Sequence, residues 1–338
     1  MKLAILGLGF MGSTHLRALR AIPGAELAAV FSKDEKKLSG DLTAVHGNLG
    51  APGEIVDLSG VRKYREIEPL LADPRIDAVD ICLPTCLHEE VALLALRAGK
   101  HVLVEKPMAL DTWAVGRMVS HAARHGRILM AAHVLRFTPA YIALREALHQ
   151  ARLGAVRSAV FRRRCAAPPP GGWLRDPEQS GGGAFDLLIH DADMCLHLFG
   201  KPEVLSATGY RDDATGIDCM HAQLSYMDGA VVLITGGWHH PGAYPFSMEY
   251  TVTFEGGTVE YSSTGRAPTL YPPDRPEQLL ELADCDAYAA EIAYFVECCR
   301  NGETPRLCPP RESADAVNLM LLMLESRNRN GQKLVCRI

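Results

Sequence analysis

Apolar and polar positions follow two different patterns along this chain. In the first part, short and almost continuous apolar runs at 2–9, 26–32 and 101–105 predict buried strands. The stretches between them, such as 88–99, repeat their apolar residues at helical spacing. Strands that alternate with helices predict a parallel, doubly wound α/β sheet over residues 1–130.

The pattern changes after residue 130. Segments such as 156–164, 219–227 and 247–257 alternate apolar and polar residues, which predicts strands with one face packed on helices. We therefore expect a second α/β domain with a mainly antiparallel sheet. The expected domain bounds are 1–130 and 131–338.

Composition is that of an ordinary globular chain. The 338 residues are 48% hydrophobic and 22% charged, and the net charge of −5 gives no reason to expect a nucleic-acid partner. The apolar segment near the N-terminus is too short to span a bilayer and no cleavage site follows it. We expect a cytoplasmic protein without a membrane partner.

Cysteine usage argues against a disulfide scaffold and against a metal site. The ten cysteines are scattered along a long chain, and we expect them to be reduced core residues. Cys82 and Cys86 have a spacing that a metal could use, but no second pair of ligands accompanies them. We therefore expect no metal.

The first predicted strand ends in Gly7-x-Gly9-x-x-Gly12, and a predicted helix follows. In this context Gly7 permits a tight turn, Gly9 lets the backbone approach a pyrophosphate, and Gly12 allows close helix packing. The helix N-terminus then favours the anion. The motif predicts a Rossmann dinucleotide-binding domain, with Phe10 and Met11 as further contacts; a glycine turn without a ligand is the alternative.

The end of the second predicted strand bears on the choice of cofactor. NAD-binding domains place an acidic residue about 20 residues after the glycine motif, but this chain has Ser32 and Lys33 there. Without that carboxylate a 2′-phosphate is not repelled; Lys33 can pair with it and Ser32 can donate a hydrogen bond. NADP is therefore favoured over NAD. Ser32 is also the expected N-cap of a capping box that Glu35 completes, and both roles can hold together.

The apolar run 101–105 is followed by a lysine and a proline. Ligands of open α/β sheets bind at the carboxyl ends of the strands, so Lys106 should face the nicotinamide. Glu105 should orient Lys106 or contact the cofactor. A strand end in solvent is the alternative.

The segment 181–200 carries four titratable residues on one predicted helix face. Asp186, His190, Asp193 and His197 lie at i, i+4, i+7 and i+11. Such groups are costly to bury without a purpose. Metal ligation, and hydrogen bonding of the two histidines within the core, are the alternatives to a catalytic role.

Together these motifs resemble the Gfo/Idh/MocA oxidoreductase family, which includes glucose-fructose oxidoreductase and inositol dehydrogenase. The resemblance spans nearly the whole chain and rests on the order and spacing of its parts. These are Gly7-x-Gly9-x-x-Gly12, Pro84-Thr85-x-x-His88, the Ala98–Val102 run into Glu105-Lys106-Pro107, and Gly181-Gly182-Gly183-x-x-Asp186-x-x-x-His190-x-x-Asp193. The family's link is shorter at residues 46–63, for which we have no functional interpretation.

The resemblance implies roles for these residues. Lys106, Asp186 and His190 would meet around nicotinamide and substrate, and a cis peptide bond would precede Pro107. The open sheet of the second domain would form a homodimer or homotetramer. The candidate cofactor contacts are Gly7, Gly9, Phe10, Met11, Gly12, Ser32, Lys33, Pro84, Thr85, His88, Glu105 and Lys106.

We therefore expect an oxidoreductase that transfers hydride between NADP or NAD and a secondary alcohol or carbonyl of a sugar or cyclitol. His190 would take the hydroxyl proton, Lys106 would stabilise the alkoxide, and Asp186 would bind a substrate hydroxyl or orient His190. Trp173, Arg175 and Trp238 are further candidates for substrate contacts, with packing as the alternative.

Two other classes of function remain open. An NAD(P)-dependent glycosidase or lyase would use the same residues through transient oxidation and elimination. A non-catalytic dinucleotide-sensing regulator would be expected to lack part of the Lys106, Asp186 and His190 set, all of which is present.

Overall fold

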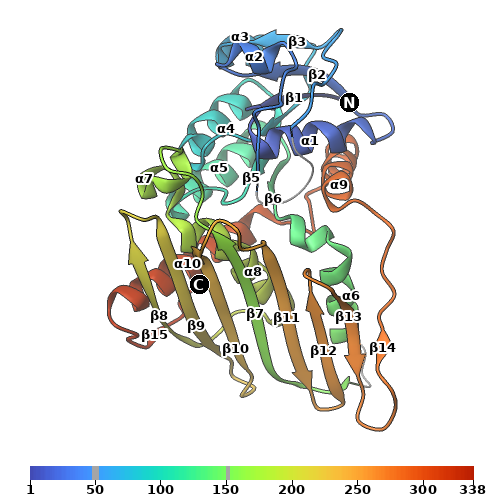
Figure 1. Ribbon diagram of the computed structural model, residues 1–338. Coiled ribbons are helices and arrows are strands. Elements are labelled where there is room, and N and C mark those ends of the chain that lie inside the picture. The colour runs from blue at the N-terminus through green and yellow to red at the C-terminus, as the bar shows by residue number, and fades with distance from the viewer. Residues whose placement is uncertain (48–52, 150–152) are drawn as a thin grey trace. The chain divides into compact units, whose positions relative to one another are not determined.

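The computed structural model describes residues 1–47, 53–149 and 153–338 (Figure 1). The chain divides into two compact units, each made of two segments. Unit 1 consists of Met1–Phe137 and Cys285–Ala314, and unit 2 of Thr138–Asp284 and Asp315–Ile338. The sequence pattern gave no sign that the chain returns to unit 1, and the bounds expected from it stay a prediction.

Unit 1 is built on six parallel strands in the order β3-β2-β1-β4-β5-β6 (Figure 1). Their apolar runs are buried because helices cover both faces of such a sheet. This is the doubly wound Rossmann sheet predicted from the sequence. The strands are Lys2–Leu6 (β1), Glu26–Phe31 (β2), Arg62–Tyr64 (β3), Ala78–Ile81 (β4), His101–Glu105 (β5) and Leu129–Ala132 (β6).

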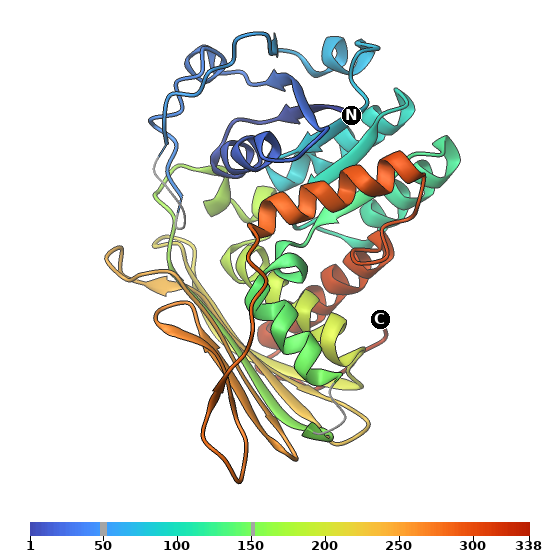
Figure 2. The ribbon, with the colours of Figure 1, turned by 90° about the vertical axis from the view of Figure 1, so that its right-hand side faces the viewer.

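The helices of unit 1 include one from the returning segment. α9 lies beside α1 in both views (Figures 1 and 2), and apolar residues of both helices belong to the same core cluster. The helices are Phe10–Arg20 (α1), Glu35–Leu38 (α2), Ile67–Ala72 (α3), His88–Arg97 (α4), Thr112–His125 (α5) and Ala287–Asn301 (α9), with 3-10 turns at Thr85–Leu87 (η1) and Val134–Phe137 (η2).

The strand order of unit 1 reverses between β1 and β4. The glycine turn follows β1, and η1 follows β4 after a short turn, so both loops leave the sheet at its carboxyl edge. Ligands of open α/β sheets bind at this position. Candidate cofactor contacts from separate motifs thus share one edge of the sheet.

Unit 2 contains a sheet of nine strands in the order β14-β13-β12-β11-β7-β10-β9-β8-β15. Among the described strands, β7 and β10 pair in parallel and the other neighbours are antiparallel, so the expected open, mainly antiparallel sheet is confirmed. The strands are Val156–Ala166 (β7), Val204–Asp212 (β8), Ile217–Ser225 (β9), Val231–His240 (β10), Ser247–Phe254 (β11), Gly257–Ser262 (β12), Arg266–Tyr271 (β13), Gln278–Leu279 (β14) and Leu334–Val335 (β15).

Helices lie on one face of this sheet (Figure 2). Among them, α8 packs on β7, β9 and β10, which buries most of its apolar residues. The remaining helices are Pro139–Leu148 (α6), Trp173–Arg175 (η4), Pro177–Ser180 (α7), Gly183–Phe199 (α8) and Pro310–Asn328 (α10), of which α10 begins in unit 1 and ends in unit 2.

The structure also bears on the expectations for the cysteines, for the link at 46–63 and for membrane-spanning helices. Cys86 and Cys285 are exposed, so the expectation that all cysteines are core residues is wrong for these two. Of the long link at 46–63, residues 48–52 lie outside the described residues, while Val56 and Leu58 pack in the core of unit 1. None of the helices in the described part of the chain has the length and apolar character that a membrane span requires.

Candidate functional site

The glycine turn after β1 is closed by its neighbours at two positions and open at the third. Gly7 has a φ of +100°, and a Cβ there would lie 2.5 Å from the carbonyl oxygen of Cys82. A Cβ on Gly12 would lie 1.8 Å from the oxygen of Gly7. A Cβ on Gly9 would have no described atom within 4 Å. Gly7 and Gly12 are therefore required for the turn, and the space at Gly9 is open to a ligand.

Helix α1 begins directly after this turn with an N-terminus suited to an anion. No side chain caps it, and its first turn contains no acidic residue. The first backbone N–H groups of a helix lack partners within the helix, and the helix dipole places partial positive charge there. A dinucleotide pyrophosphate fits this position, with Phe10 and Met11 half-buried in the first turn.

The end of β2 presents a serine and an exposed lysine. Ser32 is 7% exposed, and its hydroxyl accepts a hydrogen bond from the backbone N–H of Asp34. Asp34 is the N-cap of α2, because it directly precedes Glu35 and its carboxylate accepts from two N–H groups of the first turn. The expected capping box with Ser32 as N-cap is therefore wrong. Lys33 remains exposed at the end of the strand.

The loop after β4 holds a buried hydroxyl that a ligand could satisfy. Thr85 is 3% exposed, and its Oγ1 has no hydrogen-bond partner among the described residues. A buried polar atom without a partner is costly and is often where a ligand or water binds. Pro84 precedes it, half-buried. Together with the open space at Gly9 and the uncapped helix, Thr85 shows that the residues present fit a nicotinamide dinucleotide.

His88 is engaged differently from Thr85. It is 1% exposed, and burial lowers its pKa. Its Nδ1 lies 2.8 Å from the carbonyl oxygen of Pro107, and its Nε2 lies 2.8 Å from that of Leu83. His88 thus links the loops that follow β4 and β5, and its contact with a cofactor stays a prediction.

Strand β5 ends at Glu105, directly before Lys106. The Lys106–Pro107 peptide bond is cis, as the resemblance implies. The Oε2 atom of Glu105 accepts a hydrogen bond of 3.0 Å from the backbone N–H of Lys106. Because Glu105 is only 6% exposed, its carboxylate serves the local structure. Lys106 is half-buried at the carboxyl edge of the sheet.

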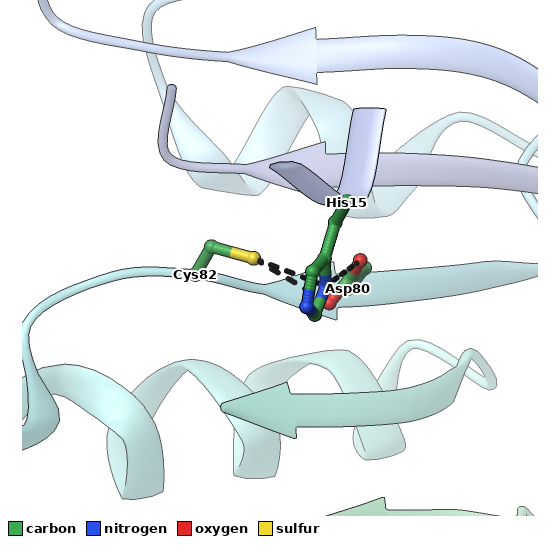
Figure 3. Close-up of side chains that lie close together, drawn as sticks. All are labelled: His15, Asp80 and Cys82. Carbon is green, nitrogen blue, oxygen red and sulfur yellow. Dashed lines mark hydrogen bonds and ion pairs between the residues drawn. The ribbon is translucent and has the colours of Figure 1, made fainter. Parts of the chain in front are cut away.

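A buried histidine joins α1 to β4 and β5 (Figure 3). The Nδ1 atom of His15 lies 2.8 Å from Oδ2 of Asp80, as Figure 3 shows. Its Nε2 atom lies 3.1 Å from Oε1 of Glu105. The sulfur of Cys82 lies 3.6 Å from Nδ1. The side chains of His15, Asp80 and Glu105 are at most 8% exposed, so these contacts lie in a medium of low polarity.

The carboxylates decide the protonation state of this histidine. Burial alone would lower the pKa of His15, but Asp80 raises it well above its ordinary value. Burial would raise the pKa of Glu105, but the ion pair with His15 and the charge of Lys106 lower it. At neutral pH the ring is therefore an imidazolium between two carboxylates.

The same cluster offers the donor atoms of a metal site. One ligand atom each from His15, Asp80 and Cys82 lies within 4.8 Å of the others. However, burial raises the pKa of Cys82, followed by the charge of Asp80, so the thiol stays neutral. Metal ligands must be deprotonated, and the ring nitrogen that faces Asp80 carries a proton. The protonation states of this cluster therefore suit a buried ion pair and do not suit a metal site.

Sequence reasoning missed both His15 and Asp80. Asp80 lies within the apolar run 77–84, and His15 lies on the buried face of a predicted helix. A charged residue on a buried element requires a partner. The aspartate within the apolar run 77–84 was therefore the available signal, because it required a partner that could neutralise its charge.

In unit 2, α8 carries the second set of candidate residues. Asp186, His190, Asp193 and His197 all lie within this one helix, as predicted. Asp193 is 1% exposed and the other three are half-buried. Burial, followed by the charge of Asp186, raises the pKa of the Cys165 thiol to about 11. Whether this helix meets Lys106 at one substrate stays a prediction.

The N-terminus of α8 is held by Trp238 and by Asp218, which sequence reasoning did not assign. Oδ2 of Asp218 accepts a 2.9 Å hydrogen bond from the backbone N–H of Ala184. Trp238 is 4% exposed and packs against Gly183, where a Cβ would lie 2.5 Å from the ring. This position supports packing, the alternative role for Trp238.

The loop before α8 contains an open hollow. A cavity of about 530 Å³ is lined by residues that include Trp173, Arg175 and Gln179. The guanidinium of Arg175 donates hydrogen bonds to the carbonyl oxygens of Pro168 (2.6 Å) and Thr215 (2.7 Å), so it holds the loop together. A substrate contact for Trp173 or Arg175 stays a prediction.

Comparison with known proteins decides the family. Residues 1–133 match the model of an oxidoreductase family with an NAD-binding Rossmann fold, and residues 141–260 match the GFO/IDH/MocA C-terminal domain. The chain belongs to the Gfo/Idh/MocA family. It is accordingly an NAD(P)-dependent oxidoreductase that acts on CH–OH groups.

Individual relatives of this Gfo/Idh/MocA protein are similar over most of their length. Trans-1,2-dihydrobenzene-1,2-diol dehydrogenase of Sus scrofa is 32% identical over 83% of this chain and 77% of its own. Myo-inositol 2-dehydrogenase of Thermotoga maritima is 26% identical over 96% of this chain and 94% of its own. The crystal structure of aldose-aldose oxidoreductase from Caulobacter crescentus has the same fold, with a TM-score of 0.84, 22% identity and 99% coverage of both chains.

Proposed function

We propose that this protein transfers hydride between a nicotinamide cofactor, with NADP preferred to NAD, and a secondary alcohol or carbonyl of a sugar or cyclitol. The observation that carries the proposal is the carboxyl edge of the unit 1 sheet. There the open position at Gly9, the uncapped N-terminus of α1 and the buried hydroxyl of Thr85 accompany Lys106.

The side chains of the two motifs divide the chemistry between them. When bound, the nicotinamide ring accepts or returns the hydride. The Lys106 ammonium stabilises the negative charge that develops on the substrate oxygen. His190 takes the hydroxyl proton during oxidation and returns it during reduction, since a histidine can do both near neutral pH. Asp186 binds a neighbouring hydroxyl or orients His190.

The substrate class follows from the polar groups available and from the relatives. Titratable residues on one face of α8 suit a substrate with several hydroxyl groups. Two relatives are named for oxidation of myo-inositol and of a 1,2-diol. A ring that carries neighbouring hydroxyl groups is therefore the substrate class that we propose.

The end of β2 supports the preference for NADP. Lys33 is exposed where the chain leaves the strand, and Ser32 stands at the position where NAD-binding domains carry an acidic residue. A lysine pairs with a 2′-phosphate, and a serine does not repel it. The preference therefore rests on the charge at two adjacent residues.

The open sheet of unit 2 supports a homodimer or homotetramer. Tyr210 of β8 and Leu233 of β10 expose 59% and 39% of their surface, although both belong to regular strands. Large exposed apolar side chains on a sheet suit a protein partner. We propose a second copy of this chain as that partner.

The first test is cofactor reduction with a panel of cyclitols, aldoses and vicinal diols. We expect Lys106→Met to lower kcat by about 10²- to 10³-fold, as loss of one electrostatic stabiliser does. His190→Ala should lower it by about 10²- to 10⁴-fold. Lys333→Met, an exposed lysine in unit 2, is the matched control. Turnover by Lys106→Met within about threefold of the wild type would contradict the assignment.

The same assay tests the cofactor preference when it is run with NADP⁺ and NAD⁺ in parallel. We expect Lys33→Ala to raise KM for NADP⁺ about tenfold, because it removes a charge-assisted contact, and to leave KM for NAD⁺ unchanged. An equal effect on both cofactors would contradict the preference. Release of sugar from glycosides without net cofactor reduction would indicate the glycosidase mechanism instead.

A further inference from the structure

His15 lies outside the set of residues that the proposed reaction uses, although it is completely buried and charged. It belongs to α1, the helix that begins at the glycine turn. Its two partners, Asp80 and Glu105, belong to the neighbouring strands β4 and β5. One imidazolium therefore connects the helix of the cofactor site to the inside of β4 and to the last residue of β5.

Both oxygens of the Glu105 carboxylate are engaged. Oε1 faces Nε2 of His15 at 3.1 Å, and Oε2 accepts from the backbone N–H of Lys106 at 3.0 Å. A carboxylate held at both oxygens has little rotational freedom. Glu105 therefore connects the ring of His15 to the backbone of Lys106, so that a shift of the ring would also shift this backbone.

The other ring nitrogen of His15, Nδ1, anchors the ring to β4. Nδ1 of His15 lies 2.8 Å from Asp80, in the middle of a strand in which every residue is buried. Tyr288 of α9 lies against the ring with a centroid separation of 5.9 Å. The imidazolium therefore has fixed neighbours on several sides and cannot rotate without breaking an ion pair.

We propose that His15 is a positioning residue for the reaction: it forms ion pairs with Asp80 and Glu105 at once and thereby holds the backbone of Lys106 relative to the glycine turn. It touches neither substrate nor cofactor. The inference rests on the proposed role of Lys106, and it predicts a loss of turnover that exceeds any loss of cofactor affinity. Small misplacements of reacting groups can cost large factors in rate.

The test compares His15→Leu, which removes both donors, with His15→Gln, which keeps an amide donor. We expect His15→Leu to lower kcat per bound cofactor at least tenfold, while the Kd of the reduced cofactor changes less than threefold. His15→Gln should recover part of the loss. His121→Leu, at a surface histidine of α5 that forms no ion pair with the residues that the structure describes, should behave like the wild type.

A second readout does not depend on finding the substrate. The backbone N–H of Lys106 should exchange with deuterium at least tenfold faster in His15→Leu than in the wild type, because its acceptor Glu105 is released. Exchange in the strands of unit 2 should not change. A merely structural role would speed exchange throughout unit 1 and leave kcat per bound cofactor unaltered.

These readouts separate the two proposals. If the wild type shows no turnover on any substrate, the proposed function fails, and the exchange at Lys106 still decides whether His15 holds that backbone. If the wild type turns over and His15→Leu stays within threefold per bound cofactor, the positioning role is overturned. Should His15→Leu not fold, the double variant His15→Leu/Asp80→Asn, which also removes a buried negative charge, takes its place with the same expected loss.

Discussion

Both units bury an ion pair next to their candidate functional residues, but they use different cations. In unit 1, the His15 ring lies between Asp80 and Glu105. In unit 2, Arg163 of β7 meets Asp191 of α8 through two hydrogen bonds of 2.8 and 3.0 Å. Each pair joins a helix to a strand, and each helix carries residues of a candidate site.

The difference between the cations separates a permanent contact from one that can be lost. A guanidinium stays charged at every pH at which proteins fold, and its fork matches a carboxylate. An imidazolium loses its charge when pH exceeds its pKa. Arg163 therefore fixes α8 unconditionally, whereas His15 fixes β5 only while it is protonated.

The largest effect should follow from breaking the pair in unit 2. Asp191→Leu leaves the Arg163 guanidinium buried without its counter-ion, since that side chain is only 3% exposed. Removing one partner of a buried pair typically costs about 3–5 kcal/mol. Urea denaturation followed by circular dichroism would measure this loss in the free energy of unfolding.

A double variant distinguishes the cost of leaving one buried charge without its partner from the net contribution of the ion pair to stability. Arg163→Met/Asp191→Leu replaces both partners by apolar groups, which in other proteins is often neutral or even stabilising. We expect it to recover most of the stability lost in the single variant. A single variant that unfolds at the same urea concentration as the wild type would show that α8 does not depend on this pair.

The intermediate effect is the pH dependence of the unit 1 pair. The folded-state pKa of His15 lies above its unfolded value of 6.5, so the stabilisation is complete below pH 6.5 and is lost as pH rises through the folded pKa. Each unit between the two pKa values is worth about 1.4 kcal/mol. The difference in unfolding free energy between wild type and His15→Leu should therefore shrink as the pH rises above 6.5.

The groups around the ring do not obscure this measurement. They are Asp80 of β4, Cys82 directly after that strand, Glu105 of β5 and Tyr288 of α9. Burial raises the pKa of the Cys82 thiol, and it raises that of Tyr288 to about 12, so neither titrates near neutral pH. A difference that stays constant with pH would contradict a charged His15.

The sequence predicted those features that depend on local pattern. The run 101–105 is strand β5 over all its residues, and the helix after the glycine motif begins at Phe10. The requirement for Gly7 and Gly12 also followed from spacing, because the close approach of backbones in this turn is a property of the motif itself.

Features that depend on partners far along the chain were not predictable in this way. His15 and Asp80 are 65 residues apart, and nothing in either segment specifies the other. The periodicity of Ala287–Asn301 indicates an apolar face but not the core in which that face is buried. Ser32 and Asp34 both precede a helix with suitable side chains, and only the position at which the helix begins decides which one caps it.

The smallest effect should come from an ion pair on the surface of unit 2. It joins the same kinds of charged group as the buried pairs, but it is exposed to solvent. Arg266 and Glu260 on neighbouring strands of unit 2 are 2.5 Å apart, but their side chains are 51% and 35% exposed. Water and salt screen such a pair, and ordering two long side chains offsets the attraction. We expect Arg266→Met to shift the urea midpoint by no more than the experimental error, at both low and high salt. A clear loss of stability that disappears in high salt would mean that geometry, and not burial, determines what these ion pairs contribute.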